Sequence, residues 1–112
     1  MCPVKLSKEF NQIILESIDD GLSILGDESV LSAFYSCLEK RKSIKRQDIP
    51  YKIDAFLGFL EELFNEGASI IERRIERSLF KRIHTVYVER KDWRFNEYVK
   101  YAHSSYVINS EK

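Results

Sequence analysis

The sequence DIPYKIDAFLGFLEELFNEGASIIERRIERSLFKRIH, residues 48–84, decides the fold because it carries the densest apolar periodicity in the chain. Within residues 53–66, apolar residues recur at helical spacing and fall on one side of a helical wheel. Pro50 favours a break before this helix, and Gly67 is expected to adopt a left-handed conformation in the turn after it. A second apolar series over residues 68–83 follows this short connection, which predicts two antiparallel helices packed as a hairpin.

The second helix of the hairpin also carries a row of cations on its outer face. These cations, called the basic arc below, are Arg73, Arg74, Arg77 and Lys81. Glu72 and Glu76 form a separate acidic row. The arc is either a solvated face with ion pairs such as Arg73–Glu76, or a surface for phosphate or an acidic partner. Phe80 lies off the apolar face, so we expect it to pack against the C-terminal segment or to sit in a subunit contact.

Two further amphipathic helices are expected before the hairpin. The first runs to about Gly26, and its small residues Ser17 and Gly21 lie on the apolar side, which favours close helix packing. Asp27 is a good N-cap for the next helix, which ends at about Lys42 and whose expected core residues include Val30, Phe34 and Leu38. The sequence therefore predicts an all-α fold, a compact four-helix core over residues 10–84, in a single domain of residues 1–112.

Residues 85–112 form a C-terminal appendix of different character. Residues 85–89 alternate and are β-branched, so they predict either a short extended segment, which needs a partner strand, or a prolongation of the preceding helix. Asp92 is expected to cap a fifth helix over about residues 93–106. Its aromatic side chains lie on two faces, which indicates an oligomer contact, although packing on the bundle alone stays an alternative. The proposed interface residues are Phe80, Trp93, Phe95, Tyr98, Tyr101 and Tyr106.

Composition sets bounds on the class of protein. The 112 residues have zero net charge, but residues 1–66 carry 8 basic and 12 acidic residues, whereas residues 67–112 carry 10 and 6. This asymmetry could orient two copies or attract an acidic partner. No apolar run is long enough for a membrane span, and the N-terminus lacks the apolar core of a signal peptide. A cytoplasmic location is therefore expected.

No catalytic, cofactor-binding or metal-binding motif is present. His84 and His103 do not stand at metal-ligand spacing, Cys2 and Cys37 are far apart, and phosphate-binding glycine loops are missing. Glu61 and Glu62 are expected to face solvent, and no histidine stands near them at the spacing of metal ligands. We therefore expect no enzyme activity, no catalytic residue, no cofactor and no metal.

The segments IKRQDIP at residues 44–50 and NEGASIIE at residues 65–72 carry a resemblance. Over about residues 10–83 the chain resembles the archaeal Nitrosopumilus output domain family, a small helical domain of unknown function found in proteins of signal transduction. The resemblance implies an archaeal source and a signalling or regulatory role, and it brings no catalytic residues. Ser43 stands where a glycine is expected in that family, so the geometry of this helix end is open.

Two functions follow from these patterns. The first is a non-catalytic protein-interaction or signalling-output module that buries its aromatic C-terminal surface against a protein partner or a second copy, with the basic arc steering an acidic partner. The alternative is a dimeric DNA-binding transcriptional regulator that uses the basic arc. The linker of about ten residues before the hairpin is longer than the turn of a helix-turn-helix motif. Aromatic and basic residues within 90–95 could also stack bases.

Overall fold

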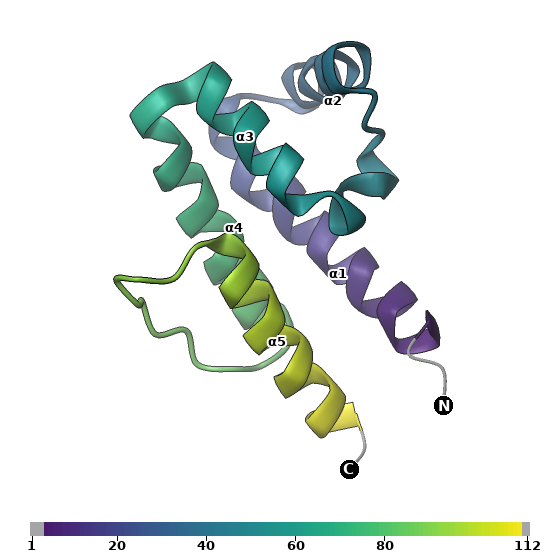
Figure 1. The fold of residues 1–112 in the computed structure, drawn as a ribbon, viewed down its shortest axis with the longest axis vertical. Helices are drawn as coiled ribbons and strands as arrows, with labels where there is room; N and C mark the ends of the chain where they lie inside the picture. The colour runs from purple at the N-terminus through teal and green to yellow at the C-terminus, as the bar shows by residue number, and fades with distance from the viewer. Residues whose placement is uncertain (1–3, 111–112) are drawn as a thin grey trace.

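The computed structural model describes residues 4–110, and the side chains of residues 9–106 within them. This part of the chain contains five α-helices, three 3-10 helices and no strand, so the predicted all-α fold is confirmed (Figure 1). The α-helices are α1 (Val4–Leu22), α2 (Glu28–Lys42), α3 (Ile53–Phe64), α4 (Ala68–Arg82) and α5 (Phe95–Ser110). The 3-10 helices are Ser23–Leu25, Arg46–Tyr51 and Asn65–Gly67. None of the helices described is both long and apolar enough to cross a membrane.

The pair α1 and α4 forms the centre of the molecule. Gly21 of α1 is buried directly against Ile75 of α4, and a Cβ added at Gly21 would stand 3.1 Å from the backbone nitrogen of Ile75. Ser17 is fully buried on the same side, where its hydroxyl donates to the Ile13 carbonyl oxygen at 2.8 Å. The close packing expected from these two small residues is therefore confirmed.

The hairpin of α3 and α4 forms as predicted, but its turn uses another residue. Gly67 has a φ of −67°, whereas Asn65 takes the positive φ of this turn, 52°, with a ψ of −121°. The reversal falls immediately after Phe64, where α3 ends, and a 3-10 helix then leads into α4. Asparagine adopts a positive φ more often than most residues, so Gly67 was the wrong choice for this role.

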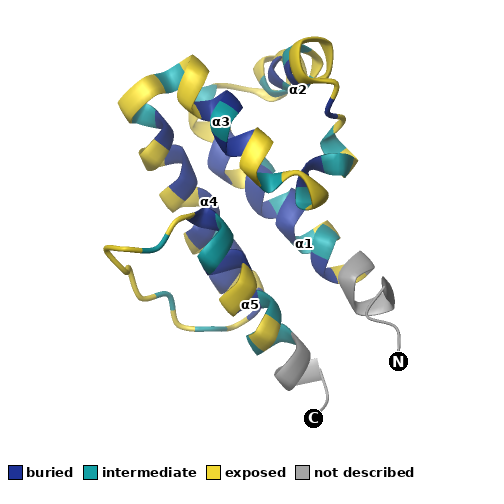
Figure 2. Cartoon of the chain, viewed as in Figure 1, coloured by how far each residue is buried: buried dark blue, intermediate teal, exposed yellow. Residues whose placement is uncertain are grey.

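Helix α2 lies at the edge of the bundle. Asp27 caps it as predicted, because its carboxylate accepts hydrogen bonds from the backbone N–H groups of Ser29 and Val30. Only Phe34 and Leu38 of this helix are buried, whereas Val30, an expected core residue, is 40% exposed. The buried and exposed faces of the helices are visible in Figure 2. At the other end of α2, Ser43 takes a left-handed φ of 58° without a glycine.

The segment between α4 and α5 is an irregular loop. Helix α4 ends at Arg82, and residues 85–90 have no regular secondary structure, so neither the extended segment nor the prolonged helix of the sequence prediction forms. His84 has a φ of 58° and turns the chain away from the helix axis. The last helix begins at Phe95 rather than at residue 93. The side chain of Glu97, not Asp92, satisfies its first turn by accepting from the Arg94 backbone N–H at 2.7 Å.

Helix α5 folds back along α4 and also contacts α1 and α3 (Figure 1). Its buried face comprises Phe95, Tyr98, Val99 and Ala102. The fifth helix is therefore part of the hydrophobic core, and the core is not limited to residues 10–84.

Candidate functional site

Three of the predicted interface residues belong to the core of the chain itself. Phe80, Phe95 and Tyr98 are buried, and the rings of Phe80 and Tyr98 lie 6.1 Å apart in an edge-to-face arrangement. The reason is that α5 covers the side of α4 that carries Phe80. These three side chains are packed mainly within the chain itself, so they cannot form the exposed centre of a protein interface, and that assignment is corrected.

The other aromatic side chains of the set lie nearer the surface. Trp93 is half-buried against Tyr98, with ring centroids 5.2 Å apart, and the Tyr106 hydroxyl donates to Glu9 at 3.2 Å. Tyr101 is 43% exposed, and two loop residues beside it, Val86 and Val88, are 80% and 52% exposed. Together with Phe80 and Trp93, these three surround one shallow hollow. We call Val86, Val88 and Tyr101 the apolar strip.

The basic arc is only partly free. Arg73 forms an ion pair with Glu89 at 3.0 Å, so the predicted Arg73–Glu76 pair is replaced by a contact with the loop. The Arg77 guanidinium lies 5.9 Å from the centre of the Tyr87 ring. The remaining members, Arg74 and Lys81, line an open hollow of about 360 Å³ with Arg77, and Asp20 of α1 lies in the same hollow.

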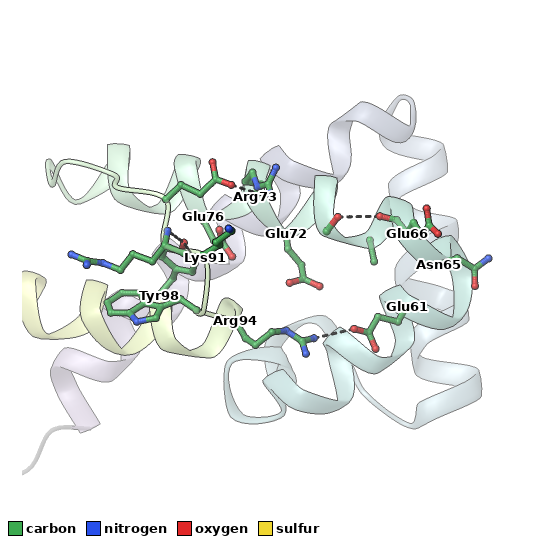
Figure 3. A pocket seen from close by; sticks show the side chains of 14 residues that line it. Glu61, Asn65, Glu66, Glu72, Arg73, Glu76, Lys91, Arg94 and Tyr98 are labelled. Carbon is green, nitrogen blue, oxygen red and sulfur yellow. Dashed lines mark hydrogen bonds and ion pairs between the residues drawn. The ribbon is translucent and has the colours of Figure 1, made fainter.

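A pocket of about 450 Å³ lies between the end of α3, the start of α4, the loop and the start of α5 (Figure 3). Its floor contains Glu72 and Glu76, which are only 9% and 5% exposed. The sequence pattern predicted only a separate acidic row at these two positions, not their burial. They stand at four-residue spacing between Ala68 and Phe80, which are both buried, and this i, i+4 series was the signal that could have revealed them.

The two buried carboxyl groups have different surroundings. The Tyr87 hydroxyl donates to Glu76 at 2.8 Å, yet burial dominates and raises the pKa of Glu76 to about 7. Burial also raises the pKa of Glu72, while the nearby Arg94 opposes this shift. Among the described residues, the Glu72 carboxylate has neither a hydrogen-bond donor nor an ion-pair partner.

Charged groups at the mouth of the pocket are largely paired with one another. Arg94 forms an ion pair with Glu61 at 2.9 Å, which links the start of α5 to α3. The Arg90 guanidinium lies 4.7 Å from the Trp93 ring centre. The Tyr98 hydroxyl accepts from the Arg90 backbone N–H at 2.6 Å and donates to the Arg90 carbonyl at 3.1 Å. The loop that closes this side of the pocket is thus held by both helices.

The site has two buried carboxyl groups, Glu72 and Glu76, at its floor and side chains of both charges at its mouth. The residues described contain no group of three histidine, cysteine, aspartate or glutamate side chains placed to hold a metal ion. The two carboxylates could instead bind the ammonium or guanidinium group of a ligand. No protein-family model matches the chain, and neither a curated protein nor a solved structure gives a significant match.

Proposed function

We propose that the chain is a non-catalytic interaction domain that binds a protein partner through the apolar strip. The exposure of Val86, Val88 and Tyr101 around one hollow is the observation that carries this proposal. Apolar side chains that are exposed together, rather than singly, mark contact surfaces. Tyrosine is also among the residues enriched at the centres of such contacts.

The loop that bears the strip is fixed at several points. Tyr87 hydrogen-bonds Glu76, Glu89 pairs with Arg73, and both backbone groups of Arg90 bond the Tyr98 hydroxyl. These contacts alternate along the loop with Val86 and Val88, which leaves the two valines outward. A surface that is ordered before binding loses less conformational entropy in a complex, so this arrangement favours recognition.

A second copy of the chain is the partner that we propose first. The N-terminal part of the sequence is net acidic and the C-terminal part is net basic, which favours complementary contacts between two copies. The resemblance over about residues 10–83 supports an archaeal signalling setting. A cytoplasmic location is part of this proposal. The basic arc would then steer an acidic partner rather than form the contact itself.

Sedimentation velocity over a concentration series tests this function. Val86→Asp together with Val88→Asp should weaken self-association at least tenfold, because two charges replace the apolar contact. Ile70→Asp is the matched control, since Ile70 is also exposed but lies on the outer face of α4. The control should associate like the wild-type chain. A wild-type chain that stays monomeric at millimolar concentration would exclude a second copy as the partner.

The geometry gives less support to the alternative, a DNA-binding regulator. Glu89 already engages Arg73, and Asp20 lies in the hollow lined by the rest of the arc. An acidic side chain within a phosphate-binding surface opposes the binding of DNA. The protein-interaction function is therefore preferred.

A further inference from the structure

The pocket floored by Glu72 contains an electrostatic feature that the interaction function does not use. Glu72 is 9% exposed as a residue and its carboxylate has no hydrogen-bond or ion-pair partner among the described residues, so the reduced hydration makes its ionised form costly. The side chain points into open pocket space on the side where Arg94 lies (Figure 3). A ligand cation at this position would supply the missing partner.

The surroundings of Glu72 restrict the kind of cation. Arg94 lies close enough to Glu72 to lower its pKa and therefore to repel a second cation. Lys91, also in the pocket lining, forms no ion pair in the described part of the chain. A simple amine or a polyamine would meet these positive charges as it approached Glu72. A ligand that carries a carboxylate beside its ammonium group could pair its ammonium with Glu72 and its carboxylate with these cations.

We propose that this pocket binds a free α-amino acid, with its ammonium group against Glu72 and its carboxylate against Arg94 and Lys91. An α-amino acid carries both charged groups on the same carbon atom, which suits the proximity of Glu72 and Arg94. A volume of about 450 Å³ lies within the range of small-molecule sites and leaves space for a side chain beyond the two charged groups. Glu76, Trp93 and Tyr98 line that space.

Thermal melting of the full chain with each of the standard amino acids at millimolar concentration identifies the binder. A ligand that binds only the folded state raises the melting temperature. The best amino acid is then compared by calorimetry with its amide, which lacks the carboxylate, and its N-acetyl form, which lacks the ammonium. Each should bind at least tenfold more weakly. Equal binding of the amide would indicate the N-terminus of a peptide and overturn the proposal, as would the absence of any stabilising amino acid.

Variants of the pocket separate the role of Glu72 from general charge effects. Glu72→Gln should weaken binding at least tenfold, and Arg94→Gln should do the same without weakening the binding of the amide, which has no carboxylate to lose and is relieved of a repelling charge. Glu66→Gln is the matched control, because Glu66 lies at the exposed edge of the same pocket, and its affinity should stay within twofold. Wild-type affinity in Glu72→Gln would overturn the proposal. Unchanged thermal unfolding shows that each variant is folded.

Binding should also strengthen with pH. The ligand ammonium against Glu72 is stabilised by negative charge on the floor, and Glu76, one helical turn further along α4, takes up a proton near pH 7. Affinity should therefore fall about tenfold between pH 8 and pH 6. A pH-independent affinity would contradict binding over this floor. The charged and titratable groups that face Glu72 and Glu76 are Glu61, Arg73, Tyr87, Glu89 and Arg94. This inference does not depend on the apolar strip, and the Val86 and Val88 variants should bind the amino acid normally.

Discussion

Gly21 and Gly58 both lie inside helices, but their surroundings predict opposite effects of an added methyl group. A Cβ at Gly21 would overlap Ile75, whereas a Cβ at Gly58 would meet no atom within 4 Å. Gly21→Ala should lower the free energy of unfolding by about 1–3 kcal/mol through overpacking. Gly58→Ala should raise it by about 0.5–1 kcal/mol, because alanine loses less backbone entropy in a helix.

Urea denaturation of both variants and the wild-type chain measures this difference. The two substitutions are chemically identical, so helix propensity cannot explain opposite signs. A Gly21→Ala protein with the same free energy of unfolding as the wild-type chain, or a higher one, would show that α1 and α4 do not approach each other as closely as the structure indicates.

Glu76 predicts how stability changes with pH. Its pKa is about 7 in the folded chain because of burial, against an ordinary value of 4.5. The folded state thus holds the proton more tightly, and this stabilisation is complete below pH 4.5 and lost as the pH rises through 7. Between pH 5 and pH 8, the group should lower the free energy of unfolding by on the order of 2 kcal/mol.

Urea denaturation at several pH values tests this prediction. Glu76→Gln can still accept the Tyr87 hydrogen bond but cannot ionise, so its stability should decline less between pH 5 and pH 8. Glu62→Gln is a control of opposite sign, because the hydrogen bond from Lys42 lowers the pKa of Glu62. The stabilisation from the Glu62 carboxylate disappears as the pH falls. Glu62→Gln should therefore lose the same stability between pH 5 and pH 8 as the wild-type chain. An unchanged loss in Glu76→Gln would contradict the prediction.

At the scale of elements, α2 depends on a polar cluster as much as on its two buried side chains. Asp19 of α1 accepts two hydrogen bonds from Arg46, at 2.6 and 3.2 Å, and one from the Tyr35 hydroxyl at 2.6 Å. The cluster therefore ties α2 and the linker after it to α1. Asp19→Asn should weaken this tie by about 1 kcal/mol, since charge-assisted bonds at a partly exposed site are lost.

Hydrogen exchange of α2 is the measurement for this prediction. The amides of Glu28–Lys42 should exchange severalfold faster in Asp19→Asn. Asp20→Asn is the neighbouring control, because Asp20 bonds Ser78 and Arg82 of α4 instead. It should leave exchange in α2 unchanged. Equal exchange in both variants would show that the cluster does not hold α2.

Periodicity could predict the helices but not how much of each face is covered. The hairpin followed from the strong apolar pattern of residues 53–83, and Asp27 was found because capping depends on neighbouring residues alone. Val30 was placed in the core wrongly, since a wheel shows which side is apolar but not whether another helix reaches it. The pocket was missed for the same reason, because the burial of Glu72 and Glu76 depends on a loop ten or more residues away.

At the scale of the whole molecule, α5 determines which surfaces remain available. It covers Phe80 and supplies buried aromatic side chains of its own, so the surplus of aromatic residues is mostly used within the chain. The sequence showed that the aromatic residues of the last helix lie on two faces. It could not show that α5 returns along α4, because this packing joins segments that are distant in the sequence. A truncation after residue 85 would therefore expose the core and could not test an interface, which is why single loop positions are the better test.

The affinity for DNA distinguishes the two candidate functions for the whole molecule. With Arg73 paired, Arg74, Arg77 and Lys81 are the members of the arc left for phosphates. Each phosphate contact contributes about 0.9 to the slope of log affinity against log salt, so three predict a slope no steeper than about −3. Binding to a labelled random duplex should be weak at 50 mM salt and lost at 200 mM.

Fluorescence anisotropy at several salt concentrations measures this slope. Replacing Arg74, Arg77 and Lys81 by alanine should remove any binding, whereas replacing Lys40, Lys45 and Lys52, which are exposed elsewhere, should change it much less. A slope well beyond −3 would require further cations and would favour the DNA-binding function, because a protein-interaction surface does not need them. A shallow slope together with loss of self-association in the Val86 and Val88 variant would instead assign recognition to the loop, with the arc limited to steering.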